Sequence, residues 1–214
     1  MSSARDAIFA AIRAARPDGA AAAQIATQAA ECAAAMRKTL PSLDSGDLPK
    51  LFAARAGAEK VGATVERVAN LAALPGAVAA YIAANGLQPD FALQPDPRLQ
   101  NLDWGALRPN QPLRPDTSLA VGLALGGVAE TGSLVFHSGP TAPTLYGFLP
   151  LHHLVALDAR SLSLRLEDYA DSPIGKLSPR NVNFITGASG TTYIEGVLAR
   201  GAHGPRRLHI VIFG

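Results

Sequence analysis

The sequence predicts an α/β domain with a mainly parallel sheet and helices on both sides, preceded by a helical segment. Hydrophobic residues make up 48% of the 214 residues, a value typical of globular proteins. Residues 1–46 show helical patterns and end at a break rich in proline, serine and glycine. Short apolar runs then alternate with helical stretches, as in proteins with parallel sheets. We therefore place a helical segment at residues 1–46 and an α/β domain at residues 47–214.

The N-terminal segment is expected to contain two helices. Ser3 can cap the first, and the turn residues at 17–19 end it. The second is expected over residues 20–40, with the only cysteine, Cys32, on its apolar face. Neighbouring alanines favour a small buried residue at Cys32 over a nucleophile. One thiol cannot ligate an iron–sulfur cluster, which needs about four cysteines, so we expect no such cofactor in this chain.

The α/β domain is expected to alternate helices with strands. Helices are predicted over residues 48–57 and 74–85, the second ending at Gly86, because glycine suits the end of a helix. Strands are predicted over residues 63–68, 90–93, 118–124, 132–136, 151–157, 183–186 and 208–213. The continuous apolar run at 118–124 is typical of a strand buried on both faces.

Composition and charge exclude several classes of function. The net charge of +2 is small and dispersed, which argues against nucleic acid as a partner. No secretory signal is visible, and the apolar stretch 119–129 is shorter than the about 20 residues of a membrane span, so we expect a cytoplasmic protein. His152 and His153 are adjacent on a predicted strand and point to opposite faces, and no zinc-ligand spacing occurs, so no metal site is expected.

Residues 183–195 form the most informative segment, interpreted as a strand, a turn of small residues and a helix. Gly187 lets the backbone turn tightly, and the N–H groups of a helix start favour an anion. The hydroxyl groups that could bind the same ligand belong to Ser189, Thr191 and Thr192. Thr192 and Glu195 also have the spacing of a capping box, so ligand binding and simple capping both stay open.

Two further segments carry candidate catalytic residues. Glu130 lies among small residues at a strand entry, where a carboxylate can serve as a base, a nucleophile or an acceptor for turn N–H groups. Thr131 and Ser133 follow it. His137 ends the next strand and is interpreted as a surface or packing residue in preference to a catalytic one. His203 lies between glycines on a loop before the last strand, as an accessible ring or part of a plain turn.

These segments together resemble the signature blocks of the LUD domain family, best those of the lactate utilisation protein C type. The blocks are AETGSLV at 129–135, ITGASGTTYIE at 185–195 and GAHGPRRLH at 201–209. Gly190 stands where the family usually has an arginine, and Tyr193 where it has an acidic residue. The resemblance implies a three-layer α/β/α sandwich similar to the ribose-phosphate isomerase and CoA-transferase-like fold.

The resemblance also implies a role in the oxidation of L-lactate to pyruvate. The chain would be a non-redox subunit, without a cofactor of its own, acting with iron–sulfur partner proteins. The 187–195 loop would hold the carboxylate of a small anionic substrate, Glu130 or His203 would handle a proton, and Thr131 and Ser133 would line the same site. We expect this site at the carboxyl ends of the strands, where open α/β sheets bind ligands. The alternative is a free-standing enzyme or binding module for a sugar phosphate or CoA ester.

Overall fold

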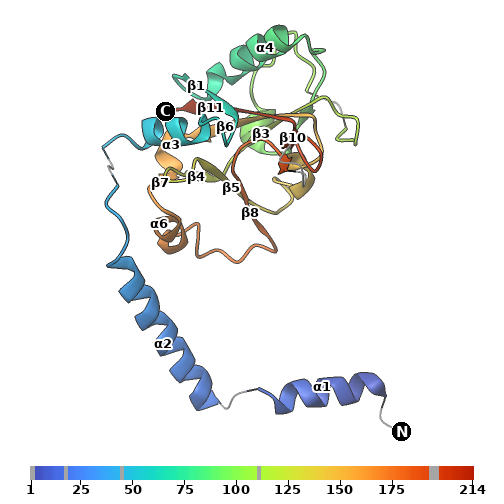
Figure 1. Ribbon diagram of the computed structural model, residues 1–214. Helices are drawn as coiled ribbons and strands as arrows, with labels where there is room; N and C mark the ends of the chain where they lie inside the picture. The colour runs from blue at the N-terminus through green and yellow to red at the C-terminus, as the bar shows by residue number, and fades with distance from the viewer. Residues whose placement is uncertain (1–2, 17–18, 44–45, 110–111, 193–197) are drawn as a thin grey trace. The chain divides into compact units, whose positions relative to one another are not determined.

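The computed structural model describes residues 3–16, 19–43, 46–109, 112–192 and 198–214 (Figure 1). The chain falls into two units, Met1–Leu43 and Asp44–Gly214, each considered by itself below. None of the helices in these described ranges is both long and apolar enough to cross a membrane.

The N-terminal unit consists of α1 (Ala4–Ala14) and α2 (Gly19–Arg37). Ser3 caps α1 as predicted: its Oγ accepts from the Asp6 N–H, and the Asp6 carboxylate accepts from the Ser3 N–H. Cys32 is exposed within this unit, so the prediction that it is buried is wrong. An apolar stripe is buried only where another element covers it, and residues 23–37 of α2 are all exposed.

The central sheet of the second unit has five strands, all parallel, as the sequence predicts. Their order is β1 (Ala63–Val68), β11 (Arg207–Phe213), β6 (His152–Asp158), β3 (Leu119–Leu123) and β2 (Ala92–Leu93). All five residues of β3 are buried, which confirms a strand covered on both faces.

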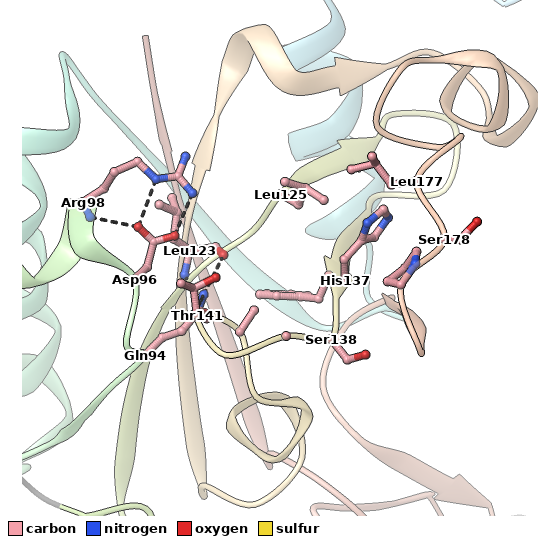
Figure 2. Close-up of a pocket in the computed structure, with 14 residues that line it drawn as sticks. Gln94, Asp96, Arg98, Leu123, Leu125, His137, Ser138, Thr141, Leu177 and Ser178 are labelled. Atoms are coloured by element: carbon pink, nitrogen blue, oxygen red, sulfur yellow. Dashed lines mark hydrogen bonds and ion pairs between the residues drawn. The ribbon is translucent and has the colours of Figure 1, made fainter.

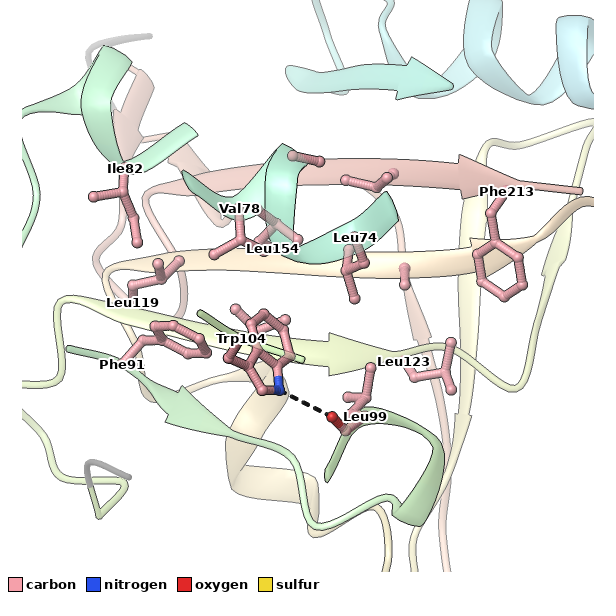
Figure 3. Packing of buried hydrophobic residues seen from close by; sticks show 14 residues of the cluster. Leu74, Val78, Ile82, Phe91, Leu99, Trp104, Leu119, Leu123, Leu154 and Phe213 are labelled. Carbon is pink, nitrogen blue, oxygen red and sulfur yellow. Dashed lines mark hydrogen bonds between the residues drawn. The ribbon is translucent and has the colours of Figure 1, made fainter. Parts of the chain in front are cut away.

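Helices cover both faces of the central sheet (Figure 1). On one face α4 (Leu74–Asn85) places Leu74, Val78 and Ile82 against side chains of β3 and β6 (Figure 3). On the other face α3 (Leu48–Ala56) packs Phe52 beneath residues of β6 and β11. Gly86 ends α4 in the left-handed conformation, with φ of 63°, as predicted. The predicted α/β fold is therefore confirmed.

A second, four-stranded sheet lies on the α3 side of the central sheet and shares its apolar cluster. Its order is β7 (Leu162–Ser163), β4 (Gly126–Val128), β5 (Ser133–His137) and β8 (Val182–Ile185). β5 runs antiparallel to both β4 and β8. The strands predicted at 132–136 and 183–186 thus exist, but they belong to this sheet rather than to the parallel one.

Short helices connect these strands. They are α5 (Pro97–Gln100), α6 (Leu166–Asp171) and the 3-10 turns η1 (Leu71–Ala73), η2 (Thr144–Gly147) and η3 (Ala159–Ser161).

The prediction that a helix begins near residue 190 is wrong. Residues Gly190–Thr192 form strand β9, which pairs antiparallel with β10 (Leu198–Arg200). Two consecutive β-branched threonines suit a strand once a partner strand is present. Glu195, and with it the proposed capping box, lies outside the described residues.

Candidate functional site

A pocket of about 450 Å³ opens at the carboxyl ends of β2 and β3 (Figure 2). Gln94 directly follows β2, Leu123 ends β3, and His137 ends β5 of the second sheet. The pocket therefore lies where the two sheets meet. The carboxyl ends of parallel strands are a common place for ligand sites in open α/β sheets.

An ion pair forms one wall of the pocket (Figure 2). Asp96 caps α5, and its carboxylate accepts from Nε and Nη2 of Arg98 at 3.0 and 2.7 Å. Burial alone would raise the pKa of Asp96, but the hydrogen bonds and the charge of Arg98 outweigh it and hold that pKa below its usual value. The carboxylate thus fixes the orientation of the guanidinium. Within the described residues Nη1 of Arg98 has no hydrogen-bond partner, so it can still donate to a ligand.

A histidine–tyrosine pair belongs to the opposite wall. His137 lines the pocket, and its Nε2 is hydrogen-bonded to the hydroxyl of Tyr169 on α6. Burial lowers the pKa of His137 and raises the pKa of Tyr169, so both side chains are neutral at pH 7. When Nε2–H donates to the tyrosine oxygen, the lone pair of Nδ1 is left to accept a proton.

Gln94 fixes the geometry between these walls. Its Oε1 accepts from the Leu123 N–H at 3.0 Å, and its Nε2 donates to the Thr141 carbonyl at 3.0 Å. Gly122 leaves space for this amide, because a Cβ there would lie 2.8 Å from Gln94 Oε1. Nearby, the Ser138 hydroxyl is buried without a hydrogen-bond partner among the described residues.

The remaining pocket wall is apolar and comes from Leu123, Leu125, Phe136 and Leu177. Apolar walls exclude water and strengthen the polar interactions that a ligand makes. The arrangement can hold a small acid through the guanidinium and accept a proton on the neutral imidazole.

The structure places Glu130 at the start of α6. Its Oε1 accepts from the Leu166 N–H at 3.0 Å, and its Oε2 lies 3.8 Å from Arg165 Nη1. The carboxylate therefore satisfies a helix N-terminus, the structural role that remained open from sequence. No interaction among the described residues joins Glu130 to His203.

Thr131 and Ser133 come together with the end of β8. Their hydroxyl oxygens are 2.7 Å apart, and Ser133 Oγ is 2.6 Å from Thr186 Oγ1. Gly187 follows directly, with φ of 84°, and a Cβ there would lie 2.7 Å from the Val61 carbonyl carbon. Gly187 therefore serves a close backbone approach to the residues that precede β1.

The predicted anion loop and the His203 loop lie against each other. The Ser189 N–H donates to the Pro205 carbonyl at 2.8 Å, and its carbonyl accepts from the Gly201 N–H at 2.9 Å. His203 is exposed, while Thr191 and Thr192 lie on β9 and pair with β10.

Both loops are at the amino ends of the central strands, so their expected position at the carboxyl ends is wrong. The His203 loop leads directly into β11. Because all five central strands are parallel, a segment that leads into one of them lies where the others also begin. The structure does not bring these loops to the pocket of Figure 2.

Sequence reasoning missed most of the pocket. No motif in the sequence singles out Asp96 and Arg98 in the pocket wall or Tyr169 behind His137, and His137 is interpreted there as a surface or packing residue. The available signal was position, because Gln94 and Asp96 directly follow a predicted strand. No cluster of three or more histidine, cysteine or acidic side chains in the described ranges could hold a metal ion.

Comparisons with known proteins agree with the fold. Residues 117–213 match the family model of the LUD domain. An uncharacterised protein of Neisseria meningitidis serogroup B is 33% identical over 87 residues, which are 40% of this chain and 37% of that protein. The match thus spans little more than a third of that relative. The crystal structure of a DUF162 family protein from Deinococcus radiodurans covers 81% of this chain and 100% of its own, with a TM-score of 0.54 and 18% identity.

Proposed function

Because residues 117–213 belong to the LUD domain family, which is implicated in lactate utilisation, we propose that this chain is a member of the C type. In this role it is a non-redox subunit that supports the oxidation of L-lactate to pyruvate with iron–sulfur partner proteins. One observation carries the proposal. An oriented arginine and a neutral histidine, itself hydrogen-bonded to Tyr169, line the same partly apolar pocket at the carboxyl ends of β2 and β3.

Each part of lactate has a counterpart in this pocket. The carboxylate pairs with the free edge of Arg98, whose orientation Asp96 holds. The methyl group packs on the apolar wall that includes Leu125 and Phe136. His137, neutral at pH 7 and positioned by Tyr169, accepts the hydroxyl proton.

The electrons must leave the chain. Oxidation of lactate to pyruvate releases two electrons and two protons, and the single cysteine cannot hold an iron–sulfur cluster. We therefore assign the two electrons to the iron–sulfur partners, the hydroxyl proton to His137 and the proton from Cα to water. His203 lies on an exposed loop at the amino ends of the strands, so for lactate in this pocket we propose His137 rather than His203 as the proton acceptor. For Glu130 we propose a positioning role, because its carboxylate binds the start of the helix that carries Tyr169.

The first test is lactate binding to the full chain, measured by titration calorimetry. Arg98→Gln should weaken L-lactate binding about tenfold or more, the usual effect of losing a charge-assisted hydrogen bond. Arg160→Gln is a matched control, because Arg160 binds Asp158 with the same distances, 3.0 and 2.7 Å, but does not line the pocket. Equal L-lactate affinities in wild type and Arg98→Gln would show that lactate does not bind in this pocket.

The second test addresses turnover. The tagged chain is purified from its native cells, and bound iron and lactate-dependent reduction of the clusters are measured. His137→Gln should keep lactate affinity but lose cluster reduction, whereas a chain without iron–sulfur partners and without a lactate response contradicts the proposal. Turnover of a sugar phosphate or CoA ester by the chain alone would favour the alternative of a free-standing enzyme.

A further inference from the structure

A basic groove lies at the other end of the central strands. It consists of two adjoining hollows of about 560 and 350 Å³, at the amino ends of β1, β11 and β6 beside the last turn of α4. The two hollows share Asn85, Arg206 and Arg207. None of the described residues that line the groove also lines the pocket of Figure 2.

Three arginines in the groove have no acidic partner among the described residues. Arg200 Nη2 donates to the Glu59 carbonyl at 3.1 Å, and Arg207 Nη1 donates to Asn85 Oδ1 at 3.0 Å. Within the part of the chain that the structure describes, neither they nor Arg206 form an ion pair. Their positive charge is therefore not neutralised within that part of the chain.

Some other arginines of the same unit are paired. Four of them pair with a carboxylate, and these are Arg98 with Asp96, Arg108 with Asp90, Arg160 with Asp158 and Arg165 with Glu130. The groove thus gathers three guanidinium groups that form no ion pair with a described residue. Like charges held close together repel one another, and a bound anion relieves that repulsion.

The backbone makes room for one of these groups. Gly62, just before β1, has φ of 72°, and a Cβ there would lie 2.6 Å from the Arg200 Cζ. The guanidinium therefore lies directly against the backbone at the start of β1. A side chain larger than hydrogen would displace it.

Polar rings complete the groove. The Tyr81 hydroxyl is 2.9 Å from His152 Nδ1, and the Tyr81 ring stacks on His209 with centroids 4.7 Å apart. Burial, followed by the charges of Arg207 and Arg206, lowers the pKa of His152. The one carboxylate bonded to these rings among the described residues is Glu66, which is 3.0 Å from His209 Nε2.

We propose that this groove binds the phosphate group of a small phosphorylated molecule, as a site separate from the lactate pocket. A phosphate carries close to two negative charges and several acceptor oxygens, and guanidinium groups match it in bidentate geometry. A single carboxylate would leave two of the three arginines unmatched. The recessed shape of the groove favours a free metabolite over the headgroup of a membrane lipid.

Calorimetric titration of the full chain with inorganic pyrophosphate tests the site. Arg206→Gln and Arg207→Gln should each weaken pyrophosphate binding about tenfold or more. Arg67→Gln, an exposed arginine near the other end of β1, should leave it unchanged. No binding to wild type, or an equal loss in all three variants, overturns the proposal, since equal losses indicate diffuse attraction to net charge.

Two further measurements distinguish this site from the lactate pocket and from a membrane-binding surface. L-lactate affinity should be unchanged in Arg206→Gln and Arg207→Gln, and pyrophosphate affinity unchanged in Arg98→Gln. The two proposals can therefore fail independently. Binding to vesicles of anionic phospholipid that pyrophosphate does not displace would assign the groove to a membrane surface and overturn the free metabolite as its ligand.

Discussion

His153 should make the stability of the protein depend on pH. The residue is 1% exposed on β6, and neither ring nitrogen has a hydrogen-bond partner among the described residues. Burial lowers its pKa from 6.5 to about 4. The unfolded chain therefore binds a proton below about pH 6.5, while the folded protein binds it only near pH 4. Stability is greatest above pH 6.5 and falls as the pH drops toward 4.

The size of this effect follows from the two pKa values. Each pKa unit corresponds to about 1.4 kcal/mol, so the change from 6.5 to about 4 is worth about 3 kcal/mol in total. About 2 kcal/mol of this should already be lost between pH 8 and pH 5. The lowered pKa values of His137 and His152 act in the same direction, so some acid sensitivity remains without His153.

Urea unfolding of the full chain at pH 8 and pH 5 measures the effect. His153→Leu is close in volume and should lose about 2 kcal/mol less than wild type between these pH values. At pH 8 the variant should be at least as stable, because two unsatisfied buried nitrogens disappear. His203→Leu, at an exposed position, is the control and should behave like wild type. An acid loss in His153→Leu equal to that of wild type would refute the assignment of this titration to His153.

Three further variants test the packing and the caps. Gly132→Ala should destabilise by at least about 2 kcal/mol more than Gly86→Ala in thermal unfolding. Both glycines have positive φ, but a Cβ at Gly132 would lie 2.8 Å from Ala56 Cα, whereas a Cβ at Gly86 would meet nothing within 4 Å. Equal losses of stability in the two variants would show that the contact with Ala56 is unimportant. Gln94→Leu should cost about 2 kcal/mol in urea unfolding, because it leaves the buried Leu123 N–H unpaired. A neutral result would mean that water replaces the amide. Ser3→Ala should destabilise α1 locally by about 1 kcal/mol. Amide hydrogen exchange in α1 should become faster while global unfolding stays unchanged. An unaltered exchange rate would argue against the capping box.

Some of the fold can be derived from local patterns alone. The alternation over residues 63–68 coincides with β1, and Gly86 ends α4 as its sequence position predicts. Such features depend on neighbours within a few residues, because periodicity and capping act at that range. The family resemblance also follows from short blocks of sequence, and it holds at the level of the LUD domain.

Local patterns failed where pairing with a second strand, or cover by another element, decides the structure. Residues 190–192 became a strand because β10 pairs with them, although their sequence also suits a helix start. Cys32 has an apolar neighbourhood in sequence but no cover within its unit. Strand content is more dependent on context than helix content, since strands require a partner.

The candidate site shows the same division between what local sequence predicts and what the tertiary structure decides. By itself the sequence determined an α/β chain with short glycine-rich turns, and it singled out Glu130, Ser189 and His203 as candidates. Only the tertiary structure decided that Glu130 binds the start of α6 and that the Ser189 and His203 loops meet at the amino ends of the strands. It likewise brought Arg98 and His137, from different sheets, to one pocket. Which strand ends meet depends on long-range sheet order, and no local spacing in the chain encodes that order.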